Sequence, residues 1–508
     1  MMEPPVKTSS PAGSSFENLR RRVGLILAAL VCGVLWFVPL PGLSAAAHHL
    51  LAILGGVVTL WVSEAIPLPV TALMGPALCV VSGIAPAKEV LRGFADPVIF
   101  LFLGSFLLAE AMLHHGLNRR IAFTLLGVPA FGKSPARVLL GFGLVTALTS
   151  MWVSNTATTA MMLPVGVSVL SEMARQASRQ AGREIDFTSL RFGTGLMLMA
   201  AFASSIGGLA TPVGTPPNLI GIGLIEKHIG VRISFFQWVA FGLPLALVLL
   251  AFLFIHLKRA CPADAGLTTS GGWIEQEKAK LGPISRAEWN VIFAFGITVT
   301  LWLLPGVVAV VAGEKSDFAQ LLNRHLPESI VAMIGGTLLF VLPVNWSRAE
   351  FTLSWREAER IDWGTILLFG GGLALGELMF STGLATWVGE GLATMLNAKT
   401  SFGLVLLFTV IAVLVSETTS NAASATMVVP VAIAVAQAAG VDPLQPALAA
   451  CLGASMGFML PVSTPPNAIV YGSRCIPLSR MIANGAALDV AGVIAVVAVV
   501  EWIVPLVF

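Results

Sequence analysis

Residues 208–220 of this chain read GLATPVGTPPNLI, and residues 457–469 repeat the pattern as GFMLPVSTPPNAI. The tetrapeptide TPPN recurs whole, at 215–218 and at 464–467. Each copy lies inside a long apolar segment, where a proline removes a backbone donor and clashes with the preceding helical turn. Each stretch therefore predicts a helix that is broken at the TPPN motif.

Two further pairs of stretches match in the same order along the chain. FLGSFLLAEAMLHHGL at 102–117 aligns with FGGGLALGELMFSTGL at 369–384, and SMWVSNTATTAMMLPV at 150–165 aligns with SETTSNAASATMVVPV at 416–431. Three ordered matches indicate an internal duplication. The shared positions of the first pair include Gly104 with Gly371, Glu110 with Glu377, Met112 with Met379 and Gly116 with Gly383.

The composition is that of a chain whose main solvent is lipid. It has 508 residues, of which 56% are hydrophobic and only 11% are charged, whereas soluble domains carry about 25% charged residues. Apolar segments of about 20 residues, the length that crosses a bilayer core, recur from Val23 to the end. We predict an all-α integral membrane protein with about eleven transmembrane helices plus two re-entrant hairpins. The net charge of +2 gives no reason to expect a nucleic-acid partner.

Charge placement predicts how the chain is oriented. With both hairpins returning to the side they entered from, 22 of the 29 Lys and Arg residues lie on the side of the N-terminus. The positive-inside rule then places the N-terminus in the cytoplasm. We expect the protein to lie in the plasma (inner) membrane. The run Arg20–Arg22 before the apolar segment 23–40 also fits a signal peptide, but a retained first helix is favoured.

Four crossings precede the first hairpin and nine precede the second, so the two hairpins open to opposite sides. The opposite orientation of the hairpins makes the duplication an inverted repeat. This architecture places a binding site near the midplane of the membrane, between the halves. The other predicted spans are 23–40, 49–64, 68–84, 97–116, 234–256, 288–311, 328–345, 363–382 and 483–506. The predicted units are a cytoplasmic tail at 1–22, a first repeat at 23–257 with hairpin 138–172 and broken helix 190–225, a cytoplasmic linker at 258–287, and a second repeat at 288–508 with hairpin 402–437 and broken helix 445–473.

Polar tripeptides interrupt both predicted hairpins, Ser-Asn-Thr at 154–156 and Ser-Asn-Ala at 420–422. Irregular backbone at membrane depth is tolerated only where protein or an aqueous cavity surrounds it. Freed carbonyls with Ser and Asn oxygens suit a hard cation, whereas helix N-termini suit an anion. The alternative is a structural kink in which Ser and Asn merely satisfy the backbone, but two symmetric sets of breaks favour a binding site.

Carboxylates that lie in or beside apolar segments are candidates for function, because a charge there is costly. Glu110 and Glu377 occupy equivalent repeat positions away from the breaks, so we expect a scaffold role. Glu64 is expected to cap a helix junction. Glu417 adjoins the second tripeptide and either tunes a cation site or faces water.

Enzyme signatures are missing from the sequence. It contains no HExxH or CxxC motif, and no strand–turn–helix context for a Walker loop or a GxSxG elbow is predicted, so we expect neither catalysis nor an organic cofactor. The five cysteines do not form a metal-like cluster. A channel-like or receptor protein on the same fold remains a competing interpretation.

The paired tripeptides and paired TPPN loops resemble those of the divalent anion/sodium symporters, which include sodium/dicarboxylate, citrate and sulfate carriers. The resemblance covers nearly the whole chain, and ASMGFMLPVSTPPNAIV at 454–470 looks like the family signature. It implies a homodimer in which a scaffold holds the interface and a transport part moves like an elevator. It also implies sodium as the co-transported ion and a small divalent anion as the substrate.

The resemblance further implies which residues bind. No Arg or Lys is among them, so co-bound cations have to offset the charge of a dianion. The implied substrate residues are Ser154, Asn155, Thr156, Ser420, Asn421, Thr464 and Pro465. The implied sodium residues are Ser150, Ser154, Asn155 and the Gly214 backbone for one ion, and Ser416, Thr419, Asn421 and Ser463 for the other.

This sequence departs from the family pattern at Ala422, where a threonine is usual. A hydroxyl missing from a site built to use it can change selectivity. The leading hypothesis is sodium-coupled symport of a C4-dicarboxylate such as succinate. A sodium-independent dicarboxylate exchanger and a sulfate or citrate carrier stay open.

Overall fold

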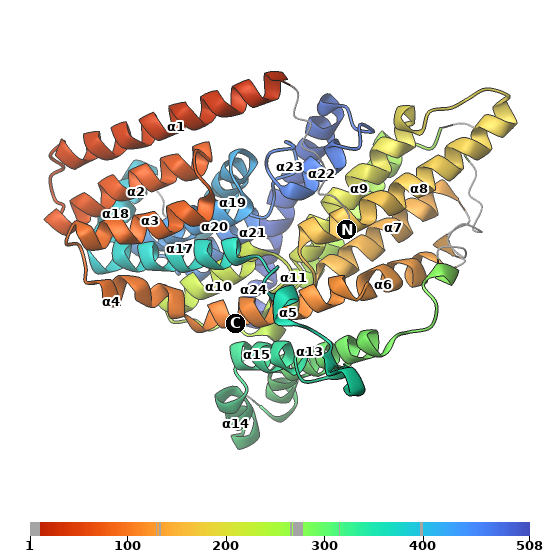
Figure 1. Cartoon of the computed structure of the whole chain (residues 1–508). Coiled ribbons are helices and arrows are strands. Elements are labelled where there is room, and N and C mark those ends of the chain that lie inside the picture. Colours follow the sequence, from red (N-terminus) through yellow and green to blue (C-terminus); the bar gives the residue numbers. More distant parts are fainter. Residues whose placement is uncertain are drawn as a thin grey trace.

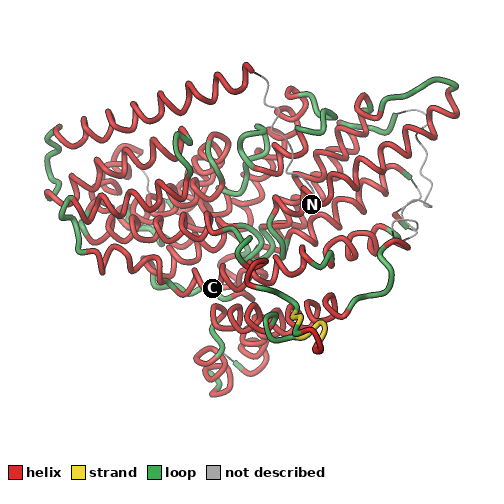
Figure 2. Tube along the Cα trace, viewed as in Figure 1, coloured by secondary structure: helices red, strands yellow, loops and turns green. Residues whose placement is uncertain are grey.

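The computed structural model describes residues 11–128, 130–131, 134–264, 267, 278–313, 315–396 and 400–508. Residues 1–10 of the predicted tail and 265–266 and 268–277 of the predicted linker lie outside these ranges. Helices dominate the described chain (Figures 1 and 2). Nine helical segments of this part are long and apolar enough to cross a membrane.

The first half is helical throughout, with α1 laid along one edge of the molecule against α2 (Figure 1). Its helices are α1 (Pro11–Phe37), α2 (Ala45–Ser63), α3 (Leu68–Val81), α4 (Ala87–Val90), α5 (Pro97–His114), α6 (Leu117–Leu126), α7 (Pro135–Ser150), α8 (Asn155–Ala181), α9 (Arg191–Gly208), α10 (Pro216–Ile229) and α11 (Phe235–Ala260).

The second half adds one small antiparallel strand pair, β1 (Pro343–Asn345) with β2 (Glu350–Phe351) (Figure 2). Its helices are α13 (Arg286–Ala312), α14 (Asp317–His325), α15 (Glu328–Leu338), α16 (Trp355–Ala358), α17 (Trp363–Ser381), α18 (Leu384–Leu396), α19 (Ser401–Thr418), α20 (Asn421–Ala438), α21 (Leu444–Gly453), α22 (Pro465–Tyr471), α23 (Leu478–Trp502) and α24 (Val504–Val507).

Helix breaks fall at all four motifs. The tripeptides separate α7 from α8 and α19 from α20, and the TPPN motifs open α10 and α22. At each tripeptide the serine caps the following helix, because Ser154 Oγ accepts from the Ala157 amide and Ser420 Oγ accepts from the Ala423 amide. Local sequence therefore decides where these helices begin.

Several short helices were not predicted, and two of them, α6 and α18, occupy equivalent places in the two halves. Each follows a glycine with left-handed backbone, Gly116 with φ 70° and Gly383 with φ 83°, a conformation that other residues adopt at a cost. This requirement explains why the glycine recurs in both halves. The helices escaped prediction because they are shorter than a membrane span and partly polar.

The predicted span 328–345 is also corrected. Its helix, α15, ends at Leu338, and the chain then turns into β1. Pro343 lies in this stretch, and its missing backbone donor does not suit a continued helix. The helix α15 packs on α5, where a Cβ at Gly104 would overlap the Ala332 backbone. Equivalently, a Cβ at Gly371 of α17 would overlap the Ala72 carbonyl of α3.

The halves exchange the second arms of their broken helices. The first-half helix α10 packs on α20 and α21, and the second-half helix α22 packs on α8 and α9. Within each half, α7 packs on α9 and α19 packs on α21. One cluster of buried apolar side chains runs through both halves as a result.

Candidate functional site

The first tripeptide tip rests on the broken helix of its own half. Ser150 Oγ donates to Asn155 Oδ1 at 2.7 Å, and Asn155 Nδ2 lies 3.5 Å from Thr215 Oγ1. A Cβ at Gly208 would come within 2.6 Å of Asn155 Oδ1. The asparagine can therefore lie this close to the helix end only because that residue is glycine.

The second tip has the same arrangement. Ser416 Oγ lies 2.8 Å from Asn421 Oδ1 and 2.7 Å from the Ala454 carbonyl oxygen. A Cβ at Gly457 would lie 3.3 Å from Asn421 Oδ1. In both halves, a serine hydroxyl, an asparagine oxygen and a glycine backbone thus meet at one point.

The asparagine of each TPPN motif closes the break in its helix. Asn218 Nδ2 donates to the carbonyls of Gly208 and Thr211, at 2.9 and 2.8 Å. Asn467 Nδ2 donates to the carbonyls of Gly457 and Leu460, at 3.1 and 3.0 Å. These carbonyls lose helical partners at the break and need another donor at membrane depth. Sequence reasoning gave these two asparagines no role, although their place in both motifs was the available signal.

Both tips and both TPPN loops line one cavity of about 670 Å³. Five of the residues implied as sodium ligands line it, namely Ser154, Asn155, Gly214, Asn421 and Ser463. Ser150 and Ser416 are fully buried and contact the tip asparagines. Thr419 is also buried, and its hydroxyl donates to the Val415 carbonyl. The seven substrate residues implied by the resemblance all line this cavity, namely Ser154, Asn155, Thr156, Ser420, Asn421, Thr464 and Pro465.

Charged side chains also line this cavity. Glu110 does so together with Arg360 and Asp362. Glu110 therefore does not lie away from the breaks as expected, whereas Glu377 forms an ion pair with Lys227 at 2.9 Å. Sequence reasoning missed Arg360 because nothing in its local sequence distinguishes it from the other basic residues that flank the spans.

Two other carboxylates now have partners. Glu417 is buried and accepts from the amides of Met459 and Leu460, at 2.8 and 3.2 Å, and from Ser463 Oγ at 2.7 Å. It therefore anchors the loop before the second TPPN motif and does not face water. Glu64 ends α2 in a left-handed conformation and forms an ion pair with Arg20 at 3.0 Å.

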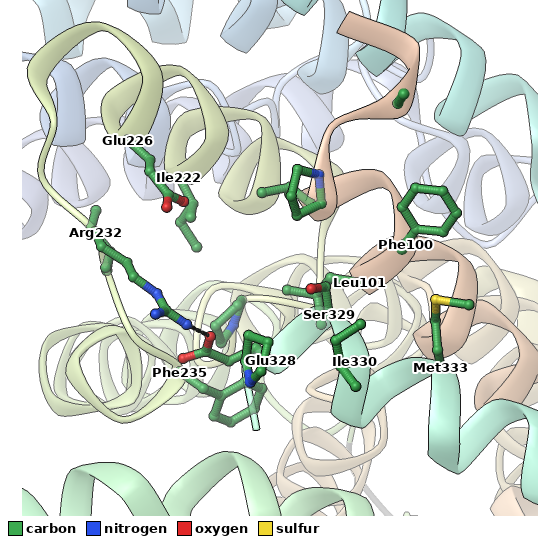
Figure 3. A pocket seen from close by; sticks show the side chains of 16 residues that line it. Phe100, Leu101, Ile222, Glu226, Arg232, Phe235, Glu328, Ser329, Ile330 and Met333 are labelled. Carbon is green, nitrogen blue, oxygen red and sulfur yellow. Dashed lines mark hydrogen bonds and ion pairs between the residues drawn. The ribbon is translucent and has the colours of Figure 1, made fainter. Parts of the chain in front are cut away.

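A second cavity of about 590 Å³ borders the loop between α9 and α10 (Figure 3). Pro212 of this loop lines the second cavity, whereas residues 213–217 line the first. The remaining walls come mainly from α5, α10 and α15, and Arg232 pairs with Glu328 beside them (Figure 3). A short stretch of backbone thus borders both cavities.

Comparison with known proteins decides the family. The sequence pattern of the sodium:sulfate symporter transmembrane region matches residues 19–508. The chain belongs to this symporter family. The predicted resemblance is thereby confirmed, and this family member is a multi-pass membrane transporter and not an enzyme.

Curated relatives of this symporter family member are similar along almost their whole length. The sodium-dependent dicarboxylate transporter SdcS of Staphylococcus saprophyticus is 34% identical over 493 residues, which cover 96% of this chain and 92% of the relative. The SdcS protein of Staphylococcus aureus is 33% identical over 491 residues, covering 96% and 91%.

Solved structures support the fold of the symporter family member. The YdaH transporter of Alcanivorax borkumensis matches with a TM-score of 0.54 and 16% identity, covering 96% of this chain and 98% of that one. MtrF of Neisseria gonorrhoeae matches with a TM-score of 0.52 and 14% identity, covering 96% and 94%. At these identities the likeness concerns the fold alone.

Proposed function

We propose that this protein couples the movement of sodium to the transport of a small divalent anion, a C4-dicarboxylate such as succinate. Relatives at 33–34% identity are named as sodium-dependent dicarboxylate transporters. The observation that carries the proposal is the meeting of both tripeptide tips and both TPPN loops around one cavity.

The helix starts favour an anion in this cavity. The helices α8 and α20 both begin among its lining residues, and a helix N-terminus presents free N–H groups and a positive dipole end. Two such tips suit a molecule with one carboxylate at each end. The proposed substrate ligands are Ser154, Asn155, Thr156, Ser420 and Asn421, with Thr464 and Pro465.

The helix ends favour cations beside the anion. The helices α7 and α9 end near Asn155, and α19 and α21 end near Asn421. Carbonyl oxygens at such ends, together with hydroxyl and amide oxygens, are ligands that hard cations accept. One sodium is assigned to Ser150, Ser154, Asn155 and Gly214, and the other to Ser416, Thr419, Asn421 and Ser463.

Alternating access is the proposed cycle, with the two halves acting as inverted repeats and a transport part moving like an elevator. The two cavities that residues 212–217 border support this cycle, because alternating access needs more than one route to the site. The N-terminus is assigned to the cytoplasm of the plasma membrane, and the assembly is proposed to be a homodimer.

Uptake into liposomes tests the proposal. The purified protein is reconstituted, and entry of radiolabelled succinate is measured with an inward sodium gradient and with choline in place of sodium. Sodium-dependent entry is expected. Entry that needs internal dicarboxylate but no sodium would instead identify an exchanger, and transport only of sulfate or citrate would reassign the substrate. Ala422 keeps the exchanger and the sulfate or citrate carrier open as alternatives. It lines the cavity at a place where a threonine would add a hydroxyl.

A further inference from the structure

The helix α23 carries an aspartate inside the protein, Asp489. It is 5% exposed, and neither of its carboxylate oxygens has a hydrogen-bond partner in the described part of the chain. An unpaired charge is costly to bury, and at membrane depth it marks a functional position by default.

Small residues bring this face of α23 close to the second broken helix. A Cβ at Gly485, one turn before Asp489, would overlap the Phe458 carbonyl. A Cβ at Gly492, one turn after it, would lie 3.0 Å from Met456 Sδ. The Asp489 carboxylate is therefore held against the segment 456–459, within interaction range of the Phe458 backbone and of Glu417.

Glu417 is the acid that Asp489 faces, and its carboxylate is already hydrogen-bonded. It is 3% exposed, and two backbone amides and the Ser463 hydroxyl donate to its carboxylate. Two buried carboxylates side by side repel each other unless a positive charge lies between them.

Basic side chains do not supply that charge. Glu417 acts electrostatically on Asp489, and the ion pairs found among the described residues connect basic side chains to acids other than these two. A bound cation would supply that charge, and a proton shared by the two acids is the alternative that the test below distinguishes.

We propose that Asp489 and Glu417 form a further cation site, which binds a sodium ion in addition to the two at the tripeptide tips. Carboxylate oxygens are the ligands that hard cations prefer. The site would lie directly behind the second tip ion, because Glu417 also accepts from Ser463. This inference rests on the sodium coupling proposed above, and it assigns an additional ion to the same transport part.

Sodium binding to the purified protein tests the site without any transport. Radioactive sodium bound at saturation is measured in detergent for the wild type, Asp489→Asn, Asp489→Glu and Glu390→Gln, the last being an exposed acid on α18. We expect Asp489→Asn to bind one sodium fewer per chain. Asp489→Glu should keep the number of ions with at least a several-fold weaker affinity, and Glu390→Gln should equal the wild type.

The outcomes separate this site from the proposed function. A folded Asp489→Asn protein that binds the wild-type number of ions would overturn the cation site, as would a change only in pH dependence, which would indicate a shared proton. If Asp489→Asn fails to fold, an Asp489→Glu protein with wild-type affinity and wild-type preference for sodium over lithium would overturn it. A wild type that binds no sodium would overturn the sodium coupling itself, and the further site with it.

Discussion

Asn155 and Asn421 each contact a serine hydroxyl through the oxygen of the side-chain amide while lining the shared cavity. This position lets one side chain face a cation on one side and an anion on the other. Replacing either asparagine by alanine removes that oxygen and should lower succinate uptake more than 10-fold, about 1.4 kcal/mol of binding free energy or more. Initial uptake rates in proteoliposomes measure this effect.

Asn323→Ala is the matched control for these variants, because Asn323 lies exposed on α14. It should transport like the wild type. Size-exclusion profiles should be the same for all three variants, because neither tip asparagine is a core residue. Full uptake by both Asn155→Ala and Asn421→Ala would remove these residues from the binding site.

Ala422 breaks the likeness between the tips, since Thr156 occupies the equivalent place in the first half. Both residues line the cavity. Ala422→Thr restores the missing hydroxyl. It should lower the KM for dicarboxylates roughly fivefold relative to the KM for other anions, which corresponds to about 1 kcal/mol of binding free energy. Competition of succinate uptake by sulfate and citrate measures the change in preference. An unchanged preference would mean that this position does not contact the substrate.

Polar residues inside apolar segments were the part of the site that the sequence could reveal. Ser154, Asn155 and Asn421 stand out against their neighbours, and all three line the cavity. Arg360 could not be found in this way, and Asp489 was not singled out although it lies inside the predicted span 483–506. Their roles depend on which distant segments pack around them, and Asp489 acquires an acidic neighbour, Glu417, that is 72 positions earlier in the chain.

Helices show a similar division between local and distant causes. The breaks at the TPPN motifs follow from proline chemistry and were predictable, whereas α6 and α18 were missed. The glycines that precede these two helices recur in both halves, so the left-handed turn was visible as a repeat without its structural meaning. The early end of α15 was missed because apolar residues continue past Leu338.

Close helix packing gives a prediction at this scale. A Cβ at Gly371 would overlap the Ala72 carbonyl, whereas a Cβ at Gly296 of α13 would meet no atom within 4 Å. Gly371→Ala should therefore destabilise the protein by about 1–3 kcal/mol, as overpacking does. Gly296→Ala should be neutral or slightly stabilising, because alanine favours helix by up to about 1 kcal/mol. Thermal unfolding of the purified proteins compares the two, and equal midpoints would contradict the tight approach of α17 to α3.

The molecule as a whole has an orientation that its charges predict. Lys315 and Arg348 are both exposed, and the charge distribution assigns Lys315 to the outside and Arg348 to the cytoplasm. In intact cells, a membrane-impermeant thiol reagent should label Lys315→Cys but label Arg348→Cys only after the cells are opened. Four of the five native cysteines are buried, and Cys32 is partly so, which keeps the background low. The reverse labelling pattern would invert the orientation.

The crossing of α10 and α22 between halves bears on how the protein is made. The ribosome releases α8 and α9 long before α22, which lies near the end of the chain. The first half must therefore wait in the membrane with part of its packing surface uncovered until translation is nearly finished. Either half expressed alone should be degraded. Two halves that are divided within the linker and expressed together as separate chains should associate and form a stable transporter.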